Sequence, residues 1–175
     1  MPHKKQAGFT LVELMVTLAV ASIVLVAAGG IMISSSNLFT NQQRRSEDKQ
    51  IGDAVFAAIS EEIIYATNVR LSQVSAGGAE CYLDTLFGQL RSSAKDVFGS
   101  EFYHGRTVSM QLSANGSYGL DLTVTVLDED NAEVYAVAST LQLLNQELSG
   151  IAISEEEPGK TVSCITYMKG DKSGG

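Results

Sequence analysis

A single carboxylate, Glu13, lies inside a long apolar stretch near the start of the chain. Residues 9–33 contain no other charged side chain. An unpaired charge costs several kcal/mol in a lipid-like environment, so a carboxylate in such a place needs a partner. The chemistry available to Glu13 is ion pairing with a cation or hydrogen bonding to one. We therefore expect Glu13 to bind a specific partner.

The rest of the chain offers no catalytic constellation around a base. The histidines are His3 and His104, and His104 is the sole candidate general base near neutral pH outside the basic N-terminal stretch. Ser109 or Ser117 would need such a base to act as a nucleophile. No motif such as GxSxG frames either serine. The sequence therefore predicts a protein that is not an enzyme and that needs no cofactor.

Two acidic clusters could bind a partner. Asp128 and Asp130 could offer oxygen ligands to Ca²⁺, but the EF-hand spacing with its central glycine and distal glutamate is missing, which favours a solvated hairpin turn. Residues 155–157 are three consecutive glutamates. This run is either a solubilising surface or a docking surface for a basic partner, and the first interpretation is the simpler one.

The apolar stretch is long enough to span a membrane. A helix over residues 9–33 would be roughly 37 Å long, against about 30 Å for the hydrocarbon core of a bilayer. Lys4 and Lys5 precede it directly, so the positive-inside rule places the N-terminus in the cytoplasm and the rest of the chain outside. Gly29 and Gly30 interrupt the stretch, either as a soft point of the helix or as a site of close helix packing.

The polar segment that follows continues the same helix. Residues 34–67 contain no proline, and apolar residues return with a spacing of four at Ile51, Val55, Ile59 and Ile63. This spacing places one apolar stripe on a helix face. We expect the stripe to pack on a sheet.

The remaining chain, residues 68–168, reads as one globular domain with an antiparallel sheet. Val69 and Leu71 indicate a short first strand. A hairpin turns at Asn115 and Gly116, a third strand covers residues 133–143, and residues 161–167 form a last strand. Residues 81–105 are predicted to be an irregular connection with one short helix, and residues 169–175 a flexible tail. The predicted fold class is α+β, with a long N-terminal helix packed on an antiparallel sheet.

Cys81 and Cys164 are the only cysteines, and neither belongs to a CxxC motif. In an exported domain such a pair is a candidate disulfide. The alternative is two buried free thiols.

The charge balance excludes a general nucleic-acid binder. The net charge is −8, and without Lys4 and Lys5 the 12 basic residues fall to 10 against 20 acidic ones, a net −10. Affinity for nucleic acids rests on neutralising phosphates with lysine and arginine.

The N-terminal junction Gly8-Phe9-Thr10-Leu11-Val12-Glu13, after a short basic leader, resembles the type IV prepilin family, which includes the pseudopilins of type II secretion systems and competence machines. The resemblance covers residues 4–34 closely. It implies that a prepilin peptidase cuts between Gly8 and Phe9 and methylates the new amino terminus of Phe9, so that residues 1–8 are a processed leader.

The same resemblance implies a function and a location. The product would be a structural subunit of a filament, inserted by an assembly platform in the cytoplasmic membrane. Its Glu13 would pair with the methylated amino terminus of a neighbouring pilin subunit. The protein would pass the membrane once and then join a cell-surface filament. Family members often carry proline where this sequence has Gly30, and this departure, together with the irregular 81–105 segment, favours a minor pilin or pseudopilin.

The competing interpretation is an ordinary secreted protein with a signal peptide. Residues 26–28, Val-Ala-Ala, resemble a signal peptidase site, and cleavage after Ala28 would release a soluble domain. Glu13 argues against this interpretation because it interrupts the apolar region that a signal peptide needs.

Overall fold

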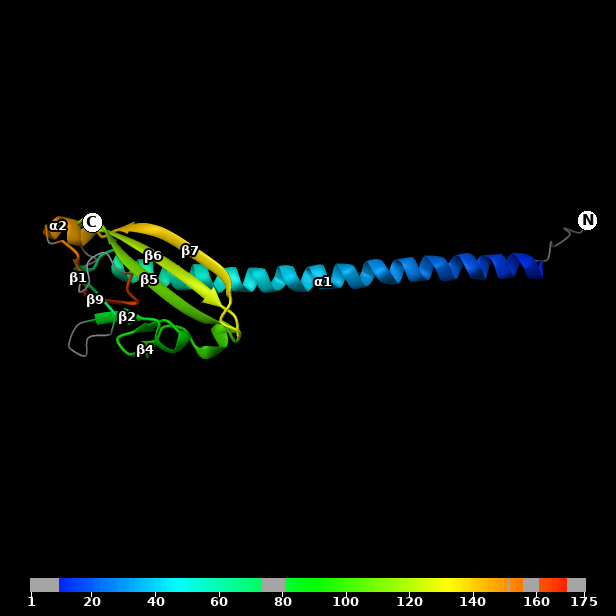
Figure 1. Cartoon of the computed structure of the whole chain (residues 1–175), viewed down its shortest axis with the longest axis horizontal. Helices are drawn as coiled ribbons and strands as arrows, with labels where there is room; N and C mark the ends of the chain where they lie inside the picture. Colours follow the sequence, from blue (N-terminus) through cyan, green and yellow to red (C-terminus); the bar gives the residue numbers. More distant parts are fainter. Residues whose placement is uncertain (1–9, 74–80, 151, 156–160, 170–175) are drawn as a thin grey trace, which may run out of the picture. The chain divides into compact units, whose positions relative to one another are not determined.

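The computed structural model describes residues 10–73, 81–150, 152–155 and 161–169. The chain divides into two compact units, Met1–Arg44 and Arg45–Gly175. Helix α1, Leu11–Ile63, contributes to both (Figure 1). Glu156 and Glu157 of the acidic run and residues 170–175 of the predicted tail lie outside the described residues.

In the first unit, α1 is apolar and uncovered. Its large apolar side chains between Leu11 and Met32 have exposed fractions from 54% to 79%. By length and composition, α1 is the one helix in the described part of the chain that could cross a membrane. A helix segment that is apolar on all its faces normally lies in a membrane or among other protein segments.

In the second unit, α1 is amphipathic, as the spacing of its apolar residues predicted. Ile51, Val55, Ile59 and Ile63 have exposed fractions of 2% or less. They belong to one core with residues of both sheets of this unit. The predicted stripe and its packing on a sheet are therefore confirmed.

Helix α1 ends at Ile63, before the predicted boundary at residue 67. Beyond it, the carbonyl of Ile64 accepts the Leu144 N–H at 2.9 Å, and the carbonyl of Tyr65 accepts a hydrogen bond from Asn145 Nδ2 at 2.8 Å. Both donors come from the short helix α2, Leu144–Ser149. The end of α1 is thus fixed by a segment 80 residues away, which local sequence pattern does not report.

A three-stranded antiparallel sheet follows the predicted meander. It has the order β5-β6-β7, with β5 at Thr107–Asn115, β6 at Gly119–Leu127 and β7 at Glu133–Gln142. Gly116 turns the first hairpin with φ +73°, a conformation that glycine adopts without a steric penalty. One face of β5 and β6 is buried throughout, through Val108, Met110, Leu112, Leu120, Leu122, Val124 and Val126.

The predicted α+β class, a long helix with antiparallel-rich sheets, is confirmed, and a second sheet adds one parallel pair of strands. Its order is β4-β3-β2-β9-β1-β8, and β1 pairs with β8 in parallel. The strands are β1 (Thr67–Ser72), β2 (Cys81–Asp84), β3 (Arg91–Ser92), β4 (Lys95–Asp96), β8 (Ser154–Glu155) and β9 (Cys164–Met168). The fold remains α+β and rich in antiparallel pairs.

Residues 81–105 are irregular, but they contain strands that were not predicted. Leu83 belongs to β2 and pairs with Ile165 of β9, so this part of the predicted irregular connection is a strand. Two 3-10 turns, η1 at Leu86–Gly88 and η2 at Ser100–Tyr103, take the place of the expected short helix. Phe87 in η1 is 86% exposed and has φ +60°.

One bridge joins the two sheets. Leu112 of β5 and Val162 exchange both backbone hydrogen bonds, at 2.8 and 2.9 Å. Val162 leads directly into β9, so the bridge holds the central strand of the mixed sheet against the edge of the three-stranded sheet. Together with α1, the two sheets enclose the core of the second unit.

Candidate functional site

The predicted processing residues Gly8 and Phe9 lie outside the described residues, and the site begins at Thr10. Helix α1 starts at the next residue, Leu11. The Leu14 N–H donates to the Thr10 carbonyl at 3.2 Å, and the Glu13 N–H donates to Thr10 Oγ1 at 3.3 Å. These two bonds define an N-cap residue, whose carbonyl and side-chain oxygen each accept a hydrogen bond from the first turn.

Glu13 lies in the first turn of α1 with its side chain exposed. In the part of the chain that the structure describes, no ion pair involves its carboxylate. An acidic group in the first helical turn interacts favourably with the positive end of the helix dipole. The surrounding side chains are apolar and exposed, so Glu13 is the one acidic group on an otherwise apolar surface from Leu11 to Met32.

Gly29 and Gly30 are both helical. A Cβ at either position would meet nothing within 4 Å. Two glycines without neighbours leave α1 a place where a second helix could approach closely or where the helix could open.

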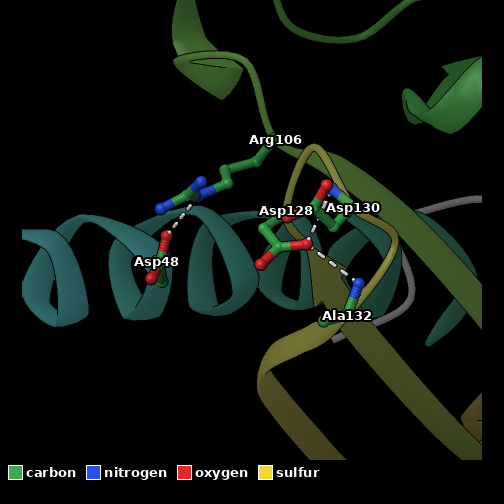
Figure 2. Close-up of polar contacts among 5 residues, drawn as sticks. All are labelled: Asp48, Arg106, Asp128, Asp130 and Ala132. Atoms are coloured by element: carbon green, nitrogen blue, oxygen red, sulfur yellow. Dashed lines mark hydrogen bonds and ion pairs between the residues drawn. The ribbon is translucent and has the colours of Figure 1, made fainter.

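In the second unit, three acidic side chains of α1 hold three different segments. Arg106 Nε donates to Asp48 Oδ1 at 2.7 Å (Figure 2), the Tyr135 hydroxyl to Asp53 Oδ1 at 2.8 Å, and the Tyr167 hydroxyl to Glu62 Oε1 at 2.8 Å. The donors come from the residue just before β5, from β7 and from β9. We call Asp48, Asp53 and Glu62 the acidic ties.

The acidic ties also shift the pKa of two of their partners. The hydrogen bond to Asp48 raises the pKa of Arg106 above its ordinary value. The hydrogen bond to Asp53 raises the pKa of the Tyr135 hydroxyl. Each carboxylate favours the protonated form of the group that donates to it. The function of these contacts is therefore to hold the sheets on the helix.

The candidate Ca²⁺ ligands Asp128 and Asp130 form a turn. Asp128 Oδ1 accepts the N–H groups of Asp130 at 3.0 Å and of Ala132 at 2.9 Å (Figure 2). Within the described ranges, no group of three or more His, Cys, Asp or Glu side chains could hold a metal ion. The Asp128 carboxylate stabilises the β6–β7 connection by bonding to its own backbone.

The structure does not form the candidate disulfide between Cys81 and Cys164. Cys164 is a free, buried cysteine. The register of β2 and β9 sets Cys81 opposite Tyr167 and Cys164 opposite Asp84. An offset of three residues separates the Cα atoms by roughly 10 Å along the strands, whereas a disulfide needs them within about 7 Å. Burial raises the pKa of the Cys164 thiol to about 11, and a hydrogen bond with Ser72 opposes that shift.

His104 is exposed and ends η2 in a left-handed conformation, with φ +47°. Its N–H donates to the Glu101 carbonyl. The residue therefore has a local backbone role at the end of a turn.

The prediction from sequence missed Thr10 and the acidic ties. Thr10 and Glu13 follow the pattern of a capping box, in which Ser or Thr precedes Glu by three residues, so the signal was present. For Asp48 and Asp53, no signal existed, because their partners lie 58 and 82 residues away.

A family model described as the prokaryotic N-terminal methylation motif matches residues 3–29. No curated protein sequence matches the chain significantly. Among solved structures, the chain is similar to a point mutant of the PilB minor pilin from Streptococcus sanguinis, with 13% sequence identity and a TM-score of 0.44. That similarity covers 78% of this chain and 35% of the other, so the chain spans about a third of the length of that protein.

Proposed function

We propose that this protein, whose residues 3–29 carry a prokaryotic N-terminal methylation motif, is a type IV pilin-like structural subunit. The observation that carries the proposal is the continuity of this motif with the exposed apolar part of α1, residues 11–32, in which Glu13 is the only charged side chain. Such a helix has no use in a free soluble domain. It fits a subunit that waits in a membrane and then packs among other helices.

In this proposal, processing creates the partner that Glu13 needs. A prepilin peptidase cuts between Gly8 and Phe9, and methylation leaves the new amino terminus of Phe9 positively charged. The Glu13 carboxylate of an incoming subunit then pairs with the amino terminus of its neighbour. A charge-assisted hydrogen bond in an apolar filament core is strong and directional, and it sets the axial register of the helices.

The second unit would be the exported part. Lys4 and Lys5 keep the N-terminus in the cytoplasm, and the assembly platform in the cytoplasmic membrane feeds the processed subunit into the filament. The partners are other pilin subunits and not nucleic acid. The function is structural and not enzymatic.

Within the family we favour a minor subunit. The irregular segment 81–105, with its exposed Phe87, suits a specialised surface better than a repeated packing surface. Quantifying subunits in sheared filaments tests this point, and finding the chain as the bulk protein would overturn it.

The mass of the exported product tests the function itself. A chain that starts at Phe9 and carries one N-terminal methyl group is the expected result. A chain that starts at Gly29 would instead identify an ordinary secreted protein with a signal peptide cleaved after Ala28. That competing function would leave the N-terminal methylation motif without a use.

A further inference from the structure

We propose that Thr10 is a positioning residue for Glu13, acting as the N-cap of α1 in the processed subunit. The inference rests on the proposed function and extends it to a residue to which no role has been assigned. Two hydrogen bonds carry it. Thr10 accepts the Leu14 N–H at its carbonyl and the Glu13 N–H at Oγ1.

The cap uses the backbone of Glu13 and leaves its side chain available. In a full capping box, the glutamate carboxylate also bonds back to the N-cap N–H. Here, of those two bonds, the structure forms the one from the Glu13 N–H to Thr10 Oγ1. Thr10 thus fixes the first turn while the Glu13 carboxylate remains free to pair with another subunit.

Thr10 lies close to the proposed cleavage site, so its cap would hold the helix turn that directly follows the new amino terminus. Cleavage after Gly8 leaves Phe9 as the single residue before the cap. In the sequence of the processed chain, the new amino terminus is therefore two residues before the start of α1 at Leu11 and four residues before Glu13. If the first turn frays, both the ammonium and the carboxylate lose their defined axial positions.

The environment determines when the cap matters. The first N–H groups of a helix have no partner within the helix. Water can satisfy them while the N-terminus lies at the membrane surface, but an apolar filament core cannot. Loss of the Thr10 hydroxyl should therefore leave insertion and cleavage nearly unchanged and weaken the step that removes the N-terminus from water.

Four substitutions in the full-length chain test the proposal. Thr10→Ser and Thr10→Asn keep a side-chain oxygen that caps a helix, Thr10→Val keeps the shape without the hydroxyl, and Thr10→Ala removes both. We expect Val and Ala to reduce filament incorporation roughly fivefold, the factor that corresponds to about 1 kcal/mol for an N-cap. Ser and Asn should assemble like the wild type.

A second readout separates capping from a general structural effect. In detergent-solubilised processed subunits, the Glu13 amide should exchange with solvent faster in Thr10→Val than in the wild type, and Thr10→Ser should restore its protection. Amides of β6 in the second unit should not change in any variant.

The results of these experiments test the role of Thr10 and the proposed function separately. Normal assembly of Thr10→Val would overturn the role of Thr10 as a cap, and so would an assembly defect of Thr10→Ser as large as that of Thr10→Val. In either case, an assembly defect of Glu13→Ala would still support the proposed function. A product that starts at Gly29 would overturn the proposed function directly, whatever the Thr10 variants did.

Discussion

Asp48 is a carboxylate with only 7% of its side chain exposed, and Arg106 is what makes that burial tolerable. The two groups approach to 2.7 Å, close enough for a charge-assisted hydrogen bond. Breaking a buried pair leaves one charge without compensation, which costs more than the intact pair contributes. The contact is therefore a sensitive point of the second unit.

We expect Arg106→Ala to destabilise the second unit by about 3 kcal/mol, because the Asp48 carboxylate would remain buried without its donor. Hydrogen exchange of the β6 amides measures this loss. Arg45→Ala is the matched control, since Arg45 is exposed on the same helix and its removal should have little effect. Equal exchange in the two variants would contradict the assigned role of the pair.

Cys164 predicts a specific dependence of stability on pH. Its thiol has a pKa of about 11 in the folded chain against an ordinary value of 9.0, because it is buried. The unfolded chain therefore loses this proton first as the pH rises. The contribution of Cys164 to the free energy of unfolding is therefore fully present below pH 9. It is lost as the pH rises from 9 to about 11, by roughly 2–3 kcal/mol in all.

Cys164→Ala should remove that part of the alkaline destabilisation. Unfolding free energies of the wild type and the variant at pH 8 and pH 10.5 give the measurement, and Cys81, present in both, cancels. An identical pH slope in the two proteins would show that the Cys164 thiol is not protected by the fold. The residue was predicted from sequence as half of a disulfide, and only the register of β2 and β9 shows why it cannot be.

Among the elements, the strands β1 and β9 were predicted from their apolar residues, but strand pairing could be predicted only where the partners are close in sequence. The β5–β6–β7 meander follows from alternating apolar residues and the turn at Asn115 and Gly116, because each strand pairs with the next one along the chain. Strand β2 was missed because Leu83 pairs with Ile165, far along the chain. The parallel pairing of β1 with β8 escaped prediction for the same reason.

Gly52 of α1 lies against the ring of Tyr135 in β7. A Cβ there would lie 2.5 Å from Tyr135 Cδ1 and 2.7 Å from Cε1. Gly52→Ala should stabilise the helix by about 1 kcal/mol, because alanine has a higher helix propensity than glycine. The added methyl group would also collide with the Tyr135 ring, and such overpacking costs about 1–3 kcal/mol. We expect net destabilisation of the second unit.

Thermal unfolding of Gly52→Ala and Gly99→Ala tests this expectation. Gly99 has φ −65° and nothing within 4 Å of an added Cβ, so its replacement should be neutral or slightly stabilising. A stabilised Gly52→Ala would mean that the Tyr135 ring moves aside without losing its bond to Asp53.

At the scale of the whole molecule, the residue that we propose for assembly and the residues of the hydrophobic core belong to different units. Glu13 lies in the unit Met1–Arg44, and the core lies in the unit Arg45–Gly175. The sequence predicted an apolar helix over residues 9–33, its amphipathic continuation over residues 34–67 and a globular domain over residues 68–168. It could not predict which residues of α1 attach the sheets, because those contacts are side-chain bonds across long sequence distances.

Glu13→Ala and Glu13→Gln should therefore impair filament incorporation without affecting cleavage after Gly8, membrane insertion or the second unit. The reason is that, in the proposed function, the carboxylate acts only when a neighbouring subunit supplies its amino terminus. Filament fractions and β6 amide exchange, measured on the same preparations, separate assembly from folding. Normal incorporation of both variants would remove the pairing role of Glu13.

The acidic ties have a mechanical consequence for a subunit whose helix is pulled along its axis. Asp48, Asp53 and Glu62 span 14 residues of α1, roughly 21 Å of helix. Each tie bonds a separate segment, through Arg106, Tyr135 and Tyr167. A force along the helix would therefore reach the rest of the second unit at three separate points and not at one. We expect α1 to be harder to detach from the second unit with all three contacts than with any one of them alone.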